Sequence, residues 1–252
     1  MEDITEIICC PRCRGKLRYE ESARREQYLC VNDDCKYSKN GFSIVSGQPV
    51  LIDFDSSIVS NDFFHENSGQ SHMRRDNGRT SIKSRIRRLL FGTNSIAVVF
   101  SRRIIEQLKD VSTRPRILVI GGGAKGSGTE PLYADNSIDL VGTDIYASPY
   151  TQVISDAHQL PFLNESFDGV WIQAVLEHVL DPPAVVDEIH RVLKPGGIVY
   201  ADTPFIQQVH EQAYDFTRFT LSGHRWLFRR FEEIDSVNMV EQNRRRDIRV
   251  FL

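Results

Sequence analysis

The chain has 252 residues, of which 40% are hydrophobic and 26% are charged, and this composition excludes collagen-like, fully disordered and coiled-coil proteins. The formal net charge of -3 argues against a dedicated nucleic-acid binder, because such proteins are usually basic. The sequence has no secretory signal and no apolar stretch of the roughly 20 residues needed to cross a bilayer, so we expect a soluble, cytoplasmic protein of one or two domains.

All five cysteines lie in the first 35 residues, which predicts a small cysteine-dependent module over residues 5–53. Cys10 and Cys13 are separated by two residues, and Cys30 and Cys35 by four, which is a spacing typical of tetrahedral zinc sites. A module of this size rarely folds on apolar burial alone, and a metal commonly supplies the missing stability. Because the protein would provide all four ligands, we expect a structural zinc.

Other interpretations of the cysteines remain open at this point. They could be reduced, buried thiols, or they could form two disulfides, which a cytoplasmic location disfavours. Cys9 could replace Cys10 in an alternative register, but the two-residue spacing is commoner, so we expect Cys9 to be free.

Residues 54–94 are predicted to be a linker followed by a basic helix. The stretch 55–81 is rich in Ser, Asn, Asp, Gly and His and has no apolar period. Residues 82–91 have the pattern of a short amphipathic basic helix. The basic stretch 74–109 could meet anionic lipid or nucleic acid, but such a run is more often a solvated helix face, so nucleic acid is not favoured as a partner.

Residues 95–252 are predicted to form an α/β domain with a doubly wound, mostly parallel sheet of the Rossmann-like kind. Apolar residues four apart, from Ile96 to Leu108, define one face of a helix. A second helix follows Asp181 and is stopped by the turn Lys194-Pro-Gly-Gly197. Short buried runs alternating with helices are typical of a parallel sheet. The expected strands are residues 117–120, 139–143, 152–154, 168–172 and 197–201, with 234–237 and 248–251 as candidates for the last two.

A glycine-rich turn follows the first of these strands. Gly121, Gly123 and Gly126 satisfy the pattern G-x-G-x-x-G, which lets a ligand approach the backbone at the start of a helix. Asp144 ends the second strand, where a carboxylate can accept both hydroxyls of a ribose. Since both cofactors carry an adenosine ribose, this pattern alone does not separate a nicotinamide cofactor from S-adenosylmethionine.

Three further motifs follow in order: residues 155–162 (Ser-Asp-Ala-His-Gln-Leu-Pro-Phe), 167–178 (Phe-Asp-Gly-Val-Trp-Ile to Glu-His) and 193–197 (Leu-Lys-Pro-Gly-Gly). The series resembles the class I S-adenosylmethionine-dependent methyltransferases of the methyltransferase-11 type, over about residues 115–205. The resemblance implies that S-adenosylmethionine is the cofactor and that Asp156, with Ala157, lies beside the adenine. It departs from the family at Val119, where members usually carry an acid, and at Lys125, which replaces the third family glycine.

The N-terminal module resembles the zinc ribbon of methyltransferase-activating partner proteins, which is sometimes fused in front of a methyltransferase domain. The Cys-Pro-x-Cys sequence, Gly15, Leu17 and residues 47–52 carry this resemblance. The two resemblances therefore support each other.

Each candidate cofactor residue also has a plainer interpretation. Asp144 and Asp156 could be ordinary capping acids at strand ends. Gln173 and Ala174 end the fourth strand, where open α/β sheets bind ligands, or they could simply be strand-end residues. His178 could line the pocket or act as a base, but we expect it to pack on its helix.

The segment after the fifth strand resembles methyltransferases found with enzymes of cell-surface glycan and lipid biosynthesis. This implies a small-molecule, glycan or lipid-linked acceptor, for which His210 and Asp215 are candidate bases and Tyr214 and Arg218 further contacts. A helix cap at Asp215 and a surface salt bridge would explain the same residues. The alternatives for the whole protein are a non-catalytic zinc-ribbon adaptor, which Val119 favours, and a nicotinamide-dependent oxidoreductase.

Overall fold

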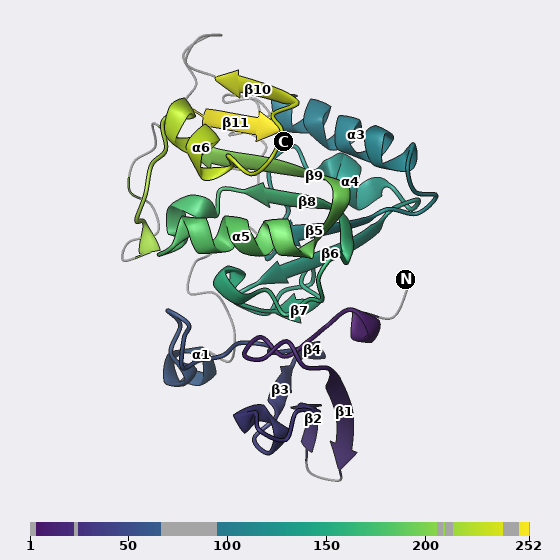
Figure 1. Cartoon of the computed structure of the whole chain (residues 1–252), viewed down its shortest axis with the longest axis vertical. Coiled ribbons are helices and arrows are strands. Elements are labelled where there is room, and N and C mark those ends of the chain that lie inside the picture. The colour runs from purple at the N-terminus through teal and green to yellow at the C-terminus, as the bar shows by residue number, and fades with distance from the viewer. Residues whose placement is uncertain are drawn as a thin grey trace, which may run out of the picture.

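The structure is a computed structural model that describes residues 4–22, 25–66, 95–205, 209, 214–238 and 247–251. A small sheet near the N-terminus lies at one end of a larger sheet covered by helices (Figure 1). The predicted basic helix at residues 82–91 and the candidate base His210 lie outside the described residues.

The small sheet has four antiparallel strands in the order β1-β2-β3-β4. Its longest pairing joins β1 and β2 from Leu17 opposite Cys30 to Ser22 opposite Arg25. Single-turn helices precede and interrupt the sheet. The elements are η1 (Ile4–Glu6), β1 (Leu17–Ser22), β2 (Arg25–Cys30), η2 (Lys36–Ser38), β3 (Phe42–Val45) and β4 (Gln48–Pro49).

The large sheet has seven strands in the order β10-β11-β9-β8-β5-β6-β7. Every strand is parallel to β5 except β11, which runs antiparallel to its neighbours β9 and β10. The predicted doubly wound, mostly parallel fold is therefore confirmed. The strands are β5 (Arg116–Ile120), β6 (Asp139–Asp144), β7 (Val153–Ile154), β8 (Phe167–Gln173), β9 (Leu193–Pro204), β10 (Asp235–Asn238) and β11 (Asp247–Phe251).

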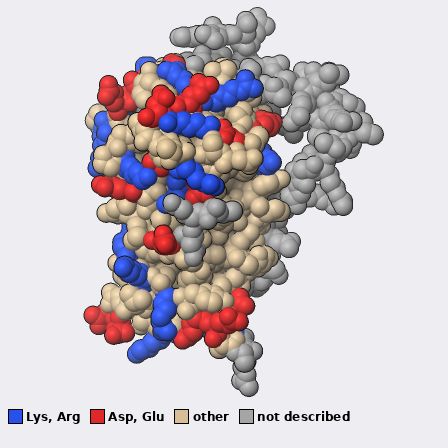
Figure 2. Space-filling model, turned by 90° about the vertical axis from the view of Figure 1, so that its right-hand side faces the viewer, with Lys and Arg blue, Asp and Glu red and all other residues tan. Residues whose placement is uncertain are grey.

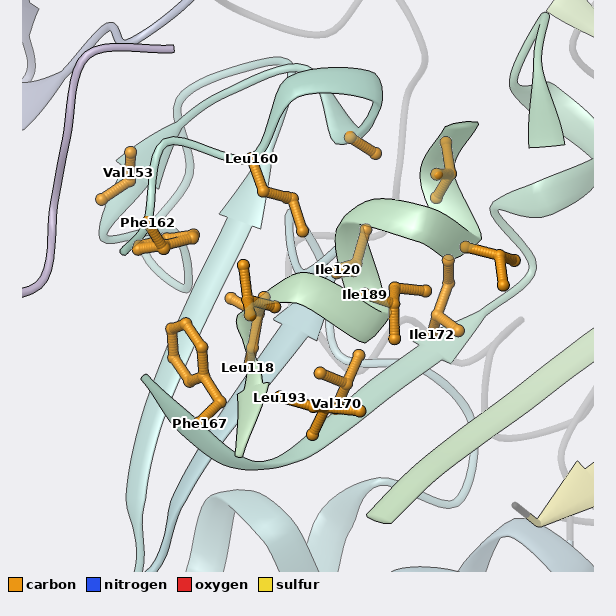
Figure 3. Close-up of a cluster of buried hydrophobic side chains, with 14 of the residues drawn as sticks. Leu118, Ile120, Val153, Leu160, Phe162, Phe167, Val170, Ile172, Ile189 and Leu193 are labelled. Carbon is orange, nitrogen blue, oxygen red and sulfur yellow. The ribbon is translucent and has the colours of Figure 1, made fainter. Parts of the chain in front are cut away.

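The helices divide between the two faces of the large sheet because side chains alternate along each strand. Ile117 and Val119 of β5 pack with α3 and α4, whereas Leu118 and Ile120 pack with α5. Figure 3 shows the α5 face, where Ile189 lies among the side chains of β5 and β8. The helices are α1 (Asn61–Glu66), α3 (Ser95–Lys109), α4 (Glu130–Ala134), α5 (Pro182–Val192) and α6 (Leu221–Leu227), with single turns at η3 (Ala157–Gln159) and η4 (Leu176–His178).

Helix α5 begins and ends as the sequence predicts. The Asp181 carboxylate accepts the backbone N–H of Ala184 at 3.2 Å, which caps the first turn. The helix ends at Val192, and β9 begins at the next residue, four residues before the predicted strand start. Gly196 has φ +77°, a conformation that favours glycine.

The N-terminal module continues the core and the edge of the large sheet. Val50 forms a parallel bridge to Ile154 of β7, and the Leu51 N–H donates to the Ile154 carbonyl at 2.8 Å. Ile8 pairs with Phe162, and both belong to the cluster of buried side chains that α5 covers. The boundaries 5–53, 54–94 and 95–252 remain predictions, but the described parts of the first and last segments share one core. None of the described helices is long and apolar enough to cross a membrane.

Candidate cofactor site and cysteine cluster

The sulfur atoms of Cys10, Cys13, Cys30 and Cys35 all lie within 4.8 Å of one another. The Cys10 and Cys35 sulfurs are 3.7 Å apart, and those of Cys13 and Cys30 are 3.4 Å apart. Four thiolates bound tetrahedrally at ~2.3 Å from a zinc ion would be about 3.8 Å apart, so the cluster has the dimensions of a zinc site. All five cysteines are free, and Cys9 is buried outside this cluster.

The surroundings of the four sulfurs also suit a metal. Backbone N–H groups of Arg12 and Cys13 stabilise the Cys10 sulfur, and that of Asn32 stabilises the Cys30 sulfur. Burial raises the pKa of both thiols, that of Cys30 to about 11, because little water solvates their charged forms. A divalent cation would offset this cost by neutralising the thiolates.

The glycine turn and Asp144 meet at the carboxyl end of the parallel strands, where open α/β sheets bind ligands. The Asp144 carboxylate accepts the backbone N–H of Gly123 at 2.8 Å and that of Ile145 at 2.7 Å. A Cβ atom at Gly123 would lie 2.6 Å from the carboxylate and 2.5 Å from the Tyr146 ring, so any other residue would displace one of these side chains. Gly121 has φ +73°, and a Cβ there would lie 2.3 Å from Val175.

The end of β8 lies against the same turn. A Cβ at Gly126 would be 2.5 Å from Oε1 of Gln173, and the amide nitrogen of Gln173 donates to the Ser127 carbonyl at 3.2 Å. The structure therefore brings Gln173 to the last glycine of the turn. The role of these residues in binding a cofactor remains a prediction.

Asp156 follows β7 and is only 6% exposed. Its carboxylate accepts hydrogen bonds from the His158 backbone N–H at 2.9 Å, from the His158 ring at 2.6 Å and from the Ser57 hydroxyl. Burial alone would raise the pKa of Asp156, but these hydrogen bonds hold it below its usual range. Ala157 begins η3 beside it. Asp156 therefore caps η3, as the plainer interpretation predicts. A contact between Asp156 and adenine stays a prediction.

Val119, which stands where the family usually has an acid, is buried in the core. It is 5% exposed and packs with Trp171, whose ring stacks on Tyr200 at a ring distance of 3.8 Å. Lys125 places its ammonium over the rings of Tyr133 and Tyr150, at 4.9 and 5.2 Å.

Glu177 is a buried acid that the sequence analysis did not select. It is fully buried, and neither carboxylate oxygen accepts a hydrogen bond from any described residue. Burial, with Asp202 and Asp215 nearby and Arg218 opposing them, raises the pKa of Glu177 to about 8. The signal was available, because a glutamate within the apolar run from Val175 to Val179 faces burial.

Residues 214–218, the predicted acceptor side, lie directly on Glu177. Its carbonyl accepts the backbone N–H groups of Phe216 and Thr217 at 2.8 and 3.2 Å. His178 forms a 2.7 Å hydrogen bond through Nδ1 with the Tyr214 carbonyl.

Asp215 and Arg218 form the predicted salt bridge through two hydrogen bonds, but it is not at the surface, because the Asp215 side chain is only 2% exposed. Thr220 and not Asp215 caps α6, with its hydroxyl 3.1 Å from the Gly223 N–H.

Comparison with known proteins agrees with this geometry. Residues 118–201 match the family model described as a methyltransferase domain. The demethylmenaquinone methyltransferase of Paenarthrobacter aurescens is 35% identical over 106 residues, which cover 38% of this chain and 41% of that protein. The protein of the same description from Staphylococcus epidermidis is 32% identical over 101 residues, covering 37% and 42%. The chain thus spans less than half the length of these relatives.

A solved structure of a putative sarcosine dimethylglycine methyltransferase from Galdieria sulphuraria aligns with 70% of this chain and 75% of that chain, at 15% identity and a TM-score of 0.45. The strand order, the antiparallel β11 and the glycine turn are those of the class I methyltransferase fold. Residues 118–201 match the methyltransferase-11-type family of S-adenosylmethionine-dependent methyltransferase domains, and a four-cysteine module precedes that region.

Proposed function

We propose that the protein transfers a methyl group from S-adenosylmethionine to a small-molecule, glycan or lipid-linked acceptor. The observation that carries the proposal is the contact of Asp144 with the glycine turn, 2.8 Å from the Gly123 N–H, inside the region that matches the family. An ionised carboxylate has about four acceptor positions and can accept ribose hydroxyls, and the two backbone N–H groups hold this one in place. The two relatives named above are described as demethylmenaquinone methyltransferases, so a compound of this kind is one candidate acceptor.

The cofactor supplies the reactive methyl group on a sulfonium, and the acceptor displaces the sulfur in line. The protein aligns the acceptor with the methyl group and keeps water away. A hydroxyl acceptor needs a group that takes its proton, for which His210 and Asp215 remain candidates, whereas an amine or a carboxylate needs none.

We also propose that the four cysteines hold one structural zinc ion. The cluster of four sulfur atoms supports this, since its members lie within 4.8 Å of one another. A zinc ion with four protein ligands has no open position for a substrate, so its role would be structural. Purified protein should contain about one zinc per chain, and Cys30→Ser should lose most of it. Unchanged zinc content in that variant would show that Cys30 is not a ligand.

The charge on one face of the molecule does not favour a nucleic-acid partner. Figure 2 shows acidic and basic side chains interspersed over the face that it displays, without a continuous basic area among the described residues. Binding to the phosphate backbone usually requires such an area.

Calorimetry with S-adenosylhomocysteine tests the cofactor assignment. The wild type should bind the product and not NAD. Asp144→Ala removes two acceptors, and since hydrogen bonds to a charged group contribute roughly 1.5–3 kcal/mol, affinity should fall at least about tenfold. Asp187→Ala is the matched control, because Asp187 is exposed on α5 and pairs with Arg230.

Two results would redirect the proposal. Binding of NAD without binding of S-adenosylhomocysteine would favour an oxidoreductase. Release of S-adenosylhomocysteine should be measured with a panel of reduced naphthoquinones, sugars and lipid-linked glycans. Binding of the cofactor with no turnover on this panel would favour the non-catalytic adaptor.

A further inference from the structure

The N-terminal segment after β4 lies against the predicted adenine end of the cofactor site. It pairs with β7 at Val50 and Leu51, and six residues further on the Ser57 hydroxyl donates to Oδ2 of Asp156. Ser56, in the same turn, donates instead to Oε1 of Gln159 at 3.1 Å. One donor to the predicted adenine acid thus comes from a segment 99 residues away in sequence.

The turn that presents Ser57 is anchored on Asp53. The backbone N–H groups of Ser56 and Ser57 both donate to the Asp53 carbonyl at 3.0 Å. Because these bonds fix the turn, the position of Asp53 determines where the Ser57 hydroxyl lies.

Asp53 is in turn held by both loops of the cysteine cluster. Its side chain is 4% exposed and lies 3.1 Å from the guanidinium of Arg12, between Cys10 and Cys13. The Tyr37 hydroxyl donates to the same carboxylate at 2.9 Å, from the turn that follows Cys35. A continuous series of polar contacts therefore joins the metal-ligand loops to Asp156.

The chemistry of the carboxylate indicates what Ser57 does. An ionised carboxylate has about four acceptor positions, and His158 occupies two on Oδ1 while Ser57 occupies one on Oδ2. One position on Oδ2 is left for an amino group such as that of adenine. Since Ser57 bonds the same oxygen, it fixes the direction of the remaining position.

We propose that Ser57 is a positioning residue of the cofactor site, and that Asp53 makes its position, and hence cofactor affinity, depend on metal in the cysteine cluster. This inference rests on the proposed function, because it takes Asp156 as the adenine contact. Metal and cofactor binding then enhance each other, since coupling between two sites is reciprocal.

Calorimetry with two probes tests the role of Ser57. One probe is S-adenosylhomocysteine, and the other is S-inosylhomocysteine, in which oxygen replaces the adenine amino group. Ser57→Ala should bind the adenine probe about fivefold more weakly and should lose most of the preference for it over the inosine probe. Ser57→Thr, which keeps the hydroxyl, should restore that preference, and Ser56→Ala should behave as the wild type.

The metal dependence has its own measurement. The affinity for S-adenosylhomocysteine should fall by a similar factor when zinc is chelated, and Asp53→Asn, measured with zinc bound, should change it in the same direction. In reverse, S-adenosylhomocysteine should slow the loss of zinc to a chelator. If the chelated protein unfolds, the Asp53→Asn variant still tests the link, because it is measured with zinc bound.

The outcomes distinguish failure of the proposed function from failure of the role of Ser57. If zinc-loaded wild type binds neither probe, the proposed function is wrong. If it binds S-adenosylhomocysteine and Ser57→Ala retains the wild-type affinities for both probes, the positioning role is wrong. Equal loss of both affinities in Ser57→Ala also overturns it, because a merely structural role does not distinguish the amino group. Unchanged affinity in Asp53→Asn would overturn the link to the cysteine loops.

Discussion

Replacing Glu177 by glutamine should make the protein more stable at alkaline pH, and the gain should grow as the pH rises. The unfolded glutamate has an ordinary pKa of 4.5, whereas burial raises the pKa in the folded protein to about 8. Between these values the folded state holds a proton that the unfolded state has lost. The stability that this proton contributes is therefore complete below pH 4.5 and is lost as the pH rises through about 8.

The magnitude follows from the same difference. Each unit of pKa corresponds to about 1.4 kcal/mol, so a rise from 4.5 to about 8 makes up to about 5 kcal/mol of stability pH-dependent. Glutamine has nearly the same shape and does not ionise. The charged groups that face Glu177 are His178 on η4, Asp202 on β9, and Asp215 and Arg218 on the segment above it, and they remain in the variant.

The assay is chemical denaturation of wild type and Glu177→Gln at several pH values between 5 and 9, with the variant-minus-wild-type difference plotted against pH. Titration of all other groups is common to both proteins. Glu188→Gln is the matched control. Burial alone would raise the pKa of Glu188, but Arg191 and Arg14 hold that pKa below its usual range. The Glu188→Gln variant should therefore lose stability and show no gain at high pH. A Glu177→Gln difference that does not change with pH would refute the buried, protonated glutamate.

Three further changes follow from local geometry. Gly123→Ala should weaken S-adenosylhomocysteine binding measured by calorimetry, because its Cβ would lie 2.6 Å from the Asp144 carboxylate; unchanged affinity would show that the turn can move. Arg14→Ala removes two hydrogen bonds to Glu188, at 2.8 and 3.0 Å. Since the arginine is 39% exposed, the free energy of unfolding should fall by only about 1 kcal/mol, and proteolysis of the N-terminal module should become faster. Asp181→Ala should lower stability by about 1 kcal/mol through loss of the α5 cap, and a variant as stable as wild type would show that the cap contributes nothing.

The sequence was most informative where a feature depends on residues close together in the chain. Strand β5 ends at the glycines that mark it, and α5 begins at the acid and the prolines that cap it. The two cysteine pairs are local as well, and their spacing predicts the four-sulfur cluster. The last two strands were also proposed from short apolar runs, and both occur.

Contacts between distant segments were beyond this kind of inference. Nothing in the run from Asp53 to Ser57 indicates that it meets Asp156, because hydrogen bonds across 99 residues depend on how β4 docks beside β7. The apolar neighbours of Glu177 in the sequence indicate its burial, but the charged groups around it could not be predicted, for a related reason. Its environment is set by Asp202 and by residues 214–218, which approach it only when the sheet is complete.

The docking of the N-terminal module covers an edge of the large sheet and buries apolar residues of the module itself. Strand β7 is a two-residue edge strand, and an exposed edge of a parallel sheet offers unpaired backbone groups to other chains. The bridge from Val50 to Ile154 covers that edge. The module, in turn, is too small to bury much surface alone, and its apolar residues such as Ile8 and Leu51 lie in the same core as Phe162. Because each part completes the other, removing the module would expose the core of the methyltransferase domain. Single substitutions such as those at Asp53 and Ser57 therefore separate cofactor binding from folding better than truncation does.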